Sequence, residues 1–363
     1  MLDIVEATQL YEAWLGKLIP INQADLEIKH KAMRVAAFSF LRATFYRWVQ
    51  TWPGICTGAV NGPNVLAVGD LHIENFGTWR DREGRLAWGI NDFDEAYLLP
   101  YTNDLVRLAT SALVASQDDM LAIRPENACS AILAGYQKCL ENGRGQPFVL
   151  SENHQRLREM ALNTLRDPLH FWGKMDQCPL VEDISPDLRT ILNNAMPDPS
   201  LELTIIHRTA GLGSLGRQRY TAIATWCGGR IAREMKRLTV SAAIWENSSL
   251  VSGSKIYYPQ ILQQAIRNPD PFTQLAGDWV VRRLAPDCSR IELTSLPKQQ
   301  DEARLLSVMG WETANIHLGS GEETAKKILG DLRHQPEDWL CEASRLMCAA
   351  TVQDWKVWKK YED

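Results

Sequence analysis

The sequence predicts a two-lobed α+β protein whose larger lobe is mostly helical. Helical patterns fill residues 1–60 and much of 105–200, whereas strand-like runs flank a glycine-rich loop that begins at Gly211. At 363 residues, the chain is long enough to bury a large core and to form two lobes. We expect three parts: a helical lobe over 1–200, a strand-rich lobe over 201–290 and C-terminal helices over 291–363 that pack on the helical lobe.

The helical lobe is predicted from apolar periodicity. Ile4 to Leu18 carries a broken apolar face, and Met33 to Val49 is a second long helix candidate. Leu105 to Ala115 and Ala128 to Leu140 continue the helical pattern. The proline-rich loop at 196–200 is the best boundary before the strand-rich lobe. Beyond that lobe, two further helices are expected, over Gln299 to Leu318 and Glu337 to Trp358.

Two short apolar runs inside the helical lobe end at acidic residues. Val65 to Val68 precedes Gly69-Asp70, and Leu86 to Ile90 precedes Asn91-Asp92. A polar turn at 80–84 comes before the second run. Two short strands joined by that turn would bring Asp70, Asn75 and Asp92 together.

An Asp, an Asn five residues later and a second Asp nearby are the groups that a phosphoryl-transfer site needs. Asp70 would orient the attacking hydroxyl and accept its proton, while Asn75 and Asp92 would hold magnesium against nucleotide phosphates. The alternative is a solvated surface loop rich in Asp and Asn. Because each of the three groups follows or precedes a strand-like run, we favour a site.

The second candidate site feature is the loop Gly211-Leu-Gly-Ser-Leu-Gly216. Its glycines Gly211, Gly213 and Gly216 and Ser214 would let backbone amides approach phosphates, and Lys236 on a following strand would pair with the same oxygens. The loop is flanked by the strand-like runs 201–206 and 220–226. Residues 217–226, followed by turn glycines at 228–229 and a third run, favour a hairpin. Two alternatives remain: a plain glycine-rich turn, and the dinucleotide fingerprint of a Rossmann oxidoreductase, which would require a helix directly after Gly216.

The segment Gly-Asp-Leu-His-x-x-Asn resembles the catalytic loop of aminoglycoside phosphotransferases and of the wider protein-kinase-like superfamily. By this resemblance Asp70 is the base, Asn75 and Asp92 are magnesium ligands, and Asp104 matches a buried Asp that braces the catalytic loop. The sequence departs from the pattern at Val68, where the family has a His, and at Asp94, which replaces the Gly of Asp-Phe-Gly and adds a carboxylate that could be a further metal ligand.

The order of these motifs resembles a particular bacterial family of unknown function, the domain of unknown function 2252 (DUF2252) family. Its segments correspond here to Gly69–Gly77, Asn91–Glu95 and Gly211–Gly216, with further matches at Phe38–Arg42 and Val280–Leu284. The resemblance implies a protein-kinase-like fold in circularly permuted order, with the catalytic loop before the glycine-rich nucleotide lobe. It also implies that Lys236 pairs with the nucleotide and that Arg217 and Arg219 lie close by.

Several other polar residues have candidate roles. His72 could touch substrate or phosphate, but a structural hydrogen bond is the simpler interpretation. Arg42 could reach an anion, although a salt-bridged arginine is expected more often. Glu95 is a possible partner of Arg107. A kinase-like lobe also needs a glutamate to pair with its lysine, and Glu246 is the candidate.

Composition restricts the partners. The net charge of −5 and the pI near 5.9 argue against nucleic acid or an anionic membrane as the main partner. The eight cysteines include no Cys-x-x-Cys pair, so a structural zinc is not expected. Since the N-terminus lacks the features of a signal peptide and no apolar run is long enough to span a membrane, a cytoplasmic location is expected.

These observations together predict an enzyme. The expected activity is transfer of a phosphoryl group from ATP, with Mg²⁺, to the hydroxyl of a small-molecule acceptor of unknown identity. The alternatives are an adenylate transferase that uses the same residues with an inverted nucleotide, and a catalytically silent, pseudokinase-like nucleotide-binding regulator.

Overall fold

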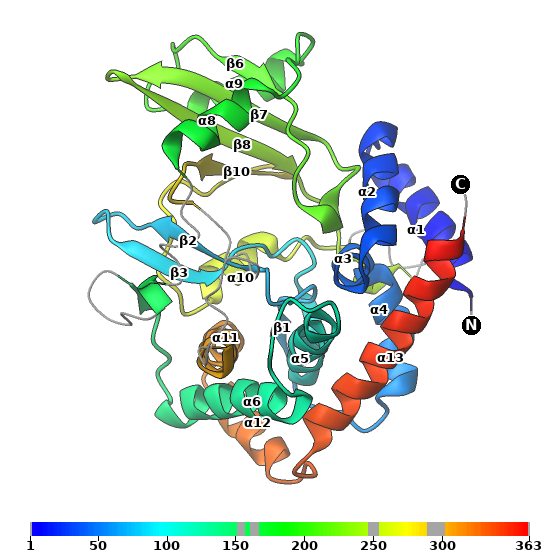
Figure 1. Ribbon diagram of the computed structural model, residues 1–363. Helices are drawn as coiled ribbons and strands as arrows, with labels where there is room; N and C mark the ends of the chain where they lie inside the picture. Colours follow the sequence, from blue (N-terminus) through cyan, green and yellow to red (C-terminus); the bar gives the residue numbers. More distant parts are fainter. Residues whose placement is uncertain (1, 151–156, 160–166, 246–253, 289–301, 362–363) are drawn as a thin grey trace.

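The computed structural model describes residues 2–150, 157–159, 167–245, 254–288 and 302–361. The fold is mixed α+β (Figure 1), with a five-stranded antiparallel sheet set above a larger, mainly helical part. The kinds of element expected in the two regions are therefore confirmed. Among the described residues, no helix is both long and apolar enough to cross a membrane.

The N-terminal segment forms four helices: α1 (Ile4–Leu18), α2 (Gln23–Val35), α3 (Ala37–Ala43) and α4 (Phe45–Ile55). The first matches its predicted bounds. The single helix expected from Met33 to Val49 is wrong, because the backbone is extended at Ala36 (φ −148°) and leaves the helical region at Thr44. The N–H of Phe38 donates instead to the Asp118 carboxylate from the end of a distant helix (2.8 Å). A tertiary hydrogen bond thus fixes the start of α3.

The buried centre of the helical part is α5 (Tyr101–Gln117), whose residues 101–115 are all buried. Around it lie α6 (Pro125–Asn142), α11 (Glu302–Leu318), α12 (Thr324–Leu332) and α13 (Trp339–Lys360). The helices predicted in these regions are confirmed, apart from the first residues of the one expected from Gln299, which lie outside the described residues. Helices α6 and α11 touch backbone to backbone, since a Cβ on Gly135 or Gly310 would lie within about 2 Å of a carbonyl of the facing helix.

Three small strand pairings shape the region beneath the sheet. Strand β1 (Asn64–Ala67) pairs with β4 (Tyr97–Pro100), and β2 (Phe76–Arg80) pairs with β3 (Leu86–Ile90), which also contacts β5 (Phe148–Val149). The apolar run before Asp92 therefore pairs with residues 76–80, not with the run before Asp70 as expected. Strands β2 and β3 follow one another in the chain and are joined by a short turn, so they pair with each other as a hairpin.

The main sheet has the strand order β6-β7-β8-β10-β9, with every neighbour antiparallel. Its strands are β6 (Thr204–Ile206), β7 (Arg219–Trp226), β8 (Gly229–Arg237), β9 (Gln274–Ala276) and β10 (Trp279–Leu284). The two-residue turn Cys227-Gly228, with positive φ at both residues, closes the predicted β7–β8 hairpin. Because a strand and not a helix follows Gly216, the Rossmann interpretation is wrong.

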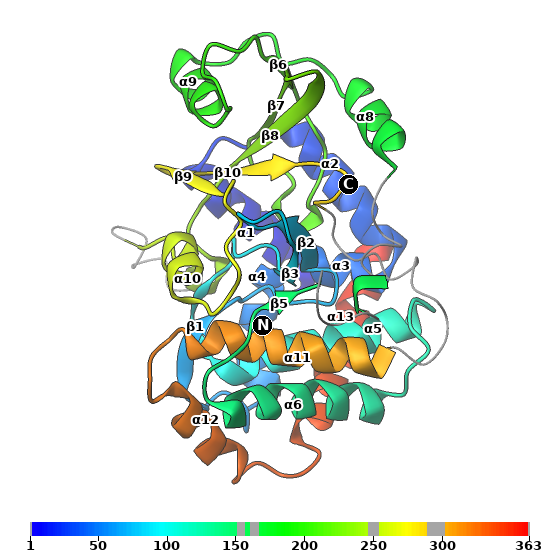
Figure 2. The same cartoon turned by 90° about the vertical axis from the view of Figure 1, so that its left-hand side faces the viewer.

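Two helices cover opposite faces of this sheet, α8 (Pro168–Asp176) and α9 (Pro186–Asn194) (Figure 2). Helix α8 packs on Ile206 and Ile223, and α9 packs on their neighbours Ile205 and Ala222, whose side chains point the other way. Both helices precede residue 200. The boundary predicted there does not separate the sheet from the helices that cover it.

Candidate active site

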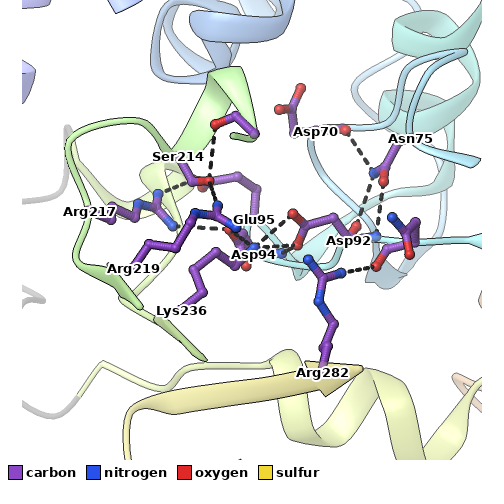
Figure 3. Close-up of polar contacts among 12 residues, drawn as sticks. Asp70, Asn75, Asp92, Asp94, Glu95, Ser214, Arg217, Arg219, Lys236 and Arg282 are labelled. Carbon is purple, nitrogen blue, oxygen red and sulfur yellow. Dashed lines mark hydrogen bonds and ion pairs between the residues drawn. The ribbon is translucent and has the colours of Figure 1, made fainter. Parts of the chain in front are cut away.

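A cleft of about 590 Å³ lies between the sheet and the helical part. Its walls come from the loop around Asp70, the ends of β2 and β3, the glycine-rich loop and the inner strands β7, β8 and β10. Alternation along β8 turns Glu234 and Lys236 to the same face, while Met235 faces α9. Figure 3 shows the polar side chains of this region.

The loop that carries Asp70 is held from below by Asp104. Its carboxylate accepts from the N–H groups of Val68 (2.7 Å) and Gly69 (3.0 Å), the two residues before Asp70. His317 contacts the same carboxylate (2.9 Å), and Tyr136 contacts the other ring nitrogen of His317 (2.7 Å). All three side chains are fully buried. The bracing geometry expected of Asp104 is present, whereas His317 and Tyr136, which lie far away in the sequence, were not predicted.

Asp70 is oriented by Arg107. The guanidinium donates twice to Asp70 Oδ1, with Nε at 2.9 Å, and also to the Leu41 carbonyl. It lies over the rings of Phe45 and Trp48, about 5 Å from each centroid. Burial raises the pKa of Asp70, and the charge of Arg107 opposes that rise. Oδ2 is left facing the glycine-rich loop.

The expected pairing of Glu95 with Arg107 is wrong. Glu95 instead accepts from Arg217 Nη2 (2.6 Å) and from the Ala242 N–H (2.7 Å). Arg107 lies one turn beyond Asp104 on α5 and faces Asp70, so it cannot reach Glu95.

Asn75 ties the two acidic loops together. Its Oδ1 accepts from the Asp92 N–H (2.9 Å), and its Nδ2 donates to the carbonyls of Asp92 (3.0 Å) and Asp70 (3.3 Å). The β2–β3 hairpin sets this geometry, because Phe76 and Ile90 form its last paired positions. The structure therefore brings Asp70, Asn75 and Asp92 into one place, as predicted.

Lys236 reaches Asp92 and Asp94 (Figure 3). Its Nζ lies 2.8 and 3.0 Å from the Asp92 oxygens and 2.6 Å from Asp94 Oδ2. Lys236 is 1% exposed, whereas the Asp92 side chain keeps 31% of its surface open to the cleft. Burial alone would raise the pKa of Asp92, but the charges of Lys236 and Arg282 outweigh it and hold that pKa well below its usual range. Burial and the Asp92 charge raise the pKa of Asp94 to about 6.

The glycine-rich loop lies against Asp70. Its centre, Leu212–Ser214, is a single 3₁₀ turn, and a Cβ on Gly213 would lie 3.3 Å from Asp70 Oδ2. Positive φ at Gly211 (72°) and Gly216 (96°) allows the chain to enter and leave this turn. The Ser214 hydroxyl accepts from Arg219 (3.0 Å) and lies 3.2 Å from the Gly211 carbonyl. Gly213 thus lies beside Asp70, whereas Lys236 is buried behind the cleft wall, where it contacts Asp92 and Asp94.

Arginines surround Glu234, a residue that the sequence analysis did not single out, and one of them is the expected Arg219. Arg208 (Nε, 3.0 Å) and Arg219 (2.6 Å) bind its carboxylate, and Arg282 lies 3.7 Å away. Burial would raise the pKa of Glu234, but these arginines hold it well below its usual range. One signal was present in the sequence: Glu234 precedes Lys236 by two residues on a strand, which places both side chains on one face.

The remaining candidates have structural partners or lie elsewhere. Arg42 forms the expected salt bridge, with Glu74 (2.6 Å). His72 lines the cleft, and its ring meets that of Phe38 edge to face. Glu246, the expected partner of Lys236, lies outside the described residues. In the described part of the chain, the partners of Lys236 are Asp92 and Asp94.

The oxygen donors at the cleft fit a magnesium ion that is shared with a nucleotide. No group of three or more His, Cys, Asp or Glu side chains within the described residues is arranged to hold a metal by itself. Magnesium, however, is commonly bound by one or two carboxylates together with substrate phosphates and water. Asp92 faces the cleft beside Asn75, and Asp94 Oδ1 is buried without a hydrogen-bond partner. These atoms are suitable donors.

Comparison with known proteins gives one match. Residues 22–167 match the model of a family described as "Uncharacterized protein conserved in bacteria (DUF2252)". Over these residues the chain is similar to that family. It covers Asp70, Asn75 and Asp92 but neither the glycine-rich loop nor Lys236. No curated protein and no solved structure matches the chain.

Proposed function

We propose that this protein is an ATP- and magnesium-dependent phosphotransferase that acts on the hydroxyl of a small molecule. The observation that carries the proposal is the convergence of Asp70, the Asn75–Asp92 pair and the glycine-rich loop at one cleft, with the buried Lys236 bound to Asp92 and Asp94 in its wall. These groups come from positions up to 166 residues apart in the chain (70 to 236). A solvated surface loop rich in Asp and Asn, the alternative interpretation, would not need a buried lysine from a distant part of the chain.

The order of parts in the sheet supports a kinase-like arrangement. The glycine-rich loop joins the first and second strands, β6 and β7, and Lys236 lies on the third, β8. Protein kinases place a glycine-rich loop over the phosphates and their nucleotide lysine on the third strand. Here the loop with Asp70 precedes this lobe in the chain, so we propose a circularly permuted kinase-like fold.

The proposed roles follow from the contacts. Asp70, with Oδ1 held by Arg107, would accept the proton of the acceptor hydroxyl at Oδ2 as the oxygen–phosphorus bond forms and ADP leaves. Lys236 and the amides of the glycine-rich loop would hold nucleotide phosphates. Asp92 and Asn75, with Asp94 beside them, would hold magnesium, which neutralises phosphate charge when it is bound.

Asp94 provides a carboxylate that a kinase-like site needs for its lysine. Helix α10 (Tyr258–Gln264), the α-helix that the described residues form between the third strand and the next, contains no acidic residue. Asp94 Oδ2 contacts Lys236 instead. The departure from Asp-Phe-Gly thus has a physical use, because Asp94 holds the lysine while Asp92 remains open to the cleft.

Transfer of label from ATP to an extract of small metabolites tests the proposal and separates its alternatives. With ATP labelled on the γ-phosphate, we expect labelled acceptor from the wild type. Asp70→Asn should lose about a hundredfold or more of this activity, because the base is removed. Label that moves only from the α-phosphate would indicate adenylate transfer. Binding of ATP without transfer of either label would favour the silent regulator.

A further inference from the structure

Helix α2 lies beside the glycine-rich loop (Figure 1). The Asn22 N–H donates to the Gly216 carbonyl (2.9 Å), and a Cβ on Gly216 would lie only 2.6 Å from Leu26. Lys29 follows Leu26 by about one helical turn and so lies on the same side of α2. Its side chain lines the cleft.

Lys29 is buried without a charged partner. It is 3% exposed, and within the described residues its Nζ makes no hydrogen bond or ion pair. The ammonium lies 5.7 Å from the centre of the Tyr46 ring. A buried ammonium that lacks a hydrogen-bonded counter-charge is costly, so a fold that retains one has a use for it.

The carboxylates that act on Lys29 each have another close partner. The charges of Glu12, Glu95 and Asp70 all act on the Lys29 amine. Each of these carboxylates has a cationic or imidazole partner at close range: Glu12 contacts His30, Glu95 contacts Arg217 and Asp70 contacts Arg107. Burial lowers the pKa of the Lys29 amine and these carboxylates oppose that shift, so an anionic group bound beside the amine would favour its charged form.

Arg217 supplies a second unpaired donor beside Lys29. Its Nη2 binds Glu95, but its Nη1 is buried, makes no hydrogen bond and lies 3.6 Å from Asp94. Arg217 lines the same cleft as Lys29, and its charge acts on the Lys29 amine. Two buried cations from different parts of the chain thus line one cleft, and the Arg217 Nη1 still lacks a hydrogen-bond acceptor.

We propose that Lys29 and Arg217 bind a carboxylate or phosphate group of the acceptor. This inference rests on the proposed function, in which Asp70 marks the position of the acceptor hydroxyl. Lys29 and Asp70 both line the cleft and the Asp70 charge acts on the Lys29 amine, whereas the nucleotide phosphates are assigned to Lys236 and the glycine-rich loop. The acceptor is therefore a small hydroxylated anion, such as a hydroxy acid or a phosphorylated alcohol, and not a neutral sugar or an aminoglycoside.

The test uses inorganic phosphate and malonate as anion probes. Each is titrated by calorimetry into the full chain saturated with magnesium and a non-hydrolysable ATP analogue, so that the nucleotide phosphate positions are already filled. Lys29→Met should weaken probe binding by about tenfold or more, since it removes a charge-assisted contact. Lys31→Met, on the exposed side of the same helix, is the matched control and should bind as the wild type does.

Three results would overturn the inference. The first is that neither probe binds the wild type. The second is that the wild type and Lys29→Met bind the probes equally well. The third is that Lys29→Met loses as much affinity for the ATP analogue as it does for the probe. Thermal unfolding verifies that the variant is folded, and Lys29→Gln serves if Lys29→Met is not. If the analogue itself fails to bind the wild type, the proposed function fails. The probes titrated into nucleotide-free protein still show in that case whether an anion site depends on Lys29.

Discussion

At the scale of single residues, the site depends on how each charge is shared. Asp92 and Asp94 both contact Lys236, yet their protonation properties diverge. Cations hold the pKa of Asp92 well below its usual range, whereas burial and the Asp92 charge raise the pKa of Asp94 to about 6. Asp92 is thus the permanent anion of the pair, which suits a group that faces phosphates and a divalent cation.

The nearby carboxyl group of Glu312 makes stability depend on pH. Burial raises the pKa of Glu312 from 4.5 to about 7, although it accepts hydrogen bonds from Asn315 (2.9 Å) and Ile90 (3.3 Å). A carboxyl group whose pKa is raised in the folded state stabilises the fold at low pH, and that contribution is lost as pH rises from about 4.5 to 7. Between pH 5 and 8, the wild type should lose about 2–3 kcal/mol of unfolding free energy relative to Glu312→Gln.

Urea unfolding at several pH values measures this difference. The exposed Glu322→Gln variant is the control and should follow the wild type at every pH. Parallel pH curves for the wild type and Glu312→Gln would show that Glu312 ionises normally in the folded protein.

The identities of the site acids could be predicted from the sequence, because their spacing is local. Asp70, Asn75 and Asp92 lie within one segment of 23 residues, counted from 70 to 92. Their partners could not be predicted. Arg107 contacts Asp70, and Arg217 contacts Glu95. These pairings depend on how distant elements are placed in the fold, which no local sequence pattern specifies. His317, which braces the loop through Asp104, is 213 residues from it.

At the scale of elements, the glycine-rich loop is fixed by the elements that it contacts. One side lies on Asp70 through Gly213, and the other lies on α2 through Gly216 and Leu26. The strands around the loop were predicted because β7 and β8 are long and joined by a two-residue turn. Strand β2, the partner of β3, was not predicted, because Phe76–Arg80 has no alternation of apolar and polar residues from which a strand could be recognised.

Glycine-to-alanine changes separate backbone strain from packing in this loop. Gly216 and Gly228 both have positive φ (96° and 82°), so alanine at either position should cost about 1 kcal/mol in backbone strain. Only at Gly216 would the new Cβ also collide with Leu26, at 2.6 Å, while Gly228 has open space. Gly216→Ala should therefore destabilise the protein by about 1–3 kcal/mol more than Gly228→Ala.

Urea unfolding of the two variants gives the comparison. Adding Leu26→Ala should remove most of the excess cost of Gly216→Ala, because it removes the collision. Equal destabilisation by both glycine variants would mean that α2 does not press on the loop.

At the scale of the whole molecule, the cleft exists because distant parts of the chain meet. The loop with Asp70 is fixed from the helical part by α5 and α11, whereas Lys236 and the arginines around Glu234 come from the sheet. The helix-rich and strand-rich regions were predictable from periodicity. The placement of α8 and α9 on the sheet was not, because an amphipathic helix does not show which apolar surface it will cover.

The central claim is that this cleft binds ATP through magnesium at Asp92, and calorimetry tests it most directly. ATP is titrated into the wild type with and without magnesium, then into Asp92→Asn and into the surface control Asp278→Asn. We expect tight binding only with magnesium, a loss of about tenfold or more in Asp92→Asn, and no change in Asp278→Asn. ATP binding that is indifferent to both magnesium and Asp92, or no ATP binding at all, would contradict the account.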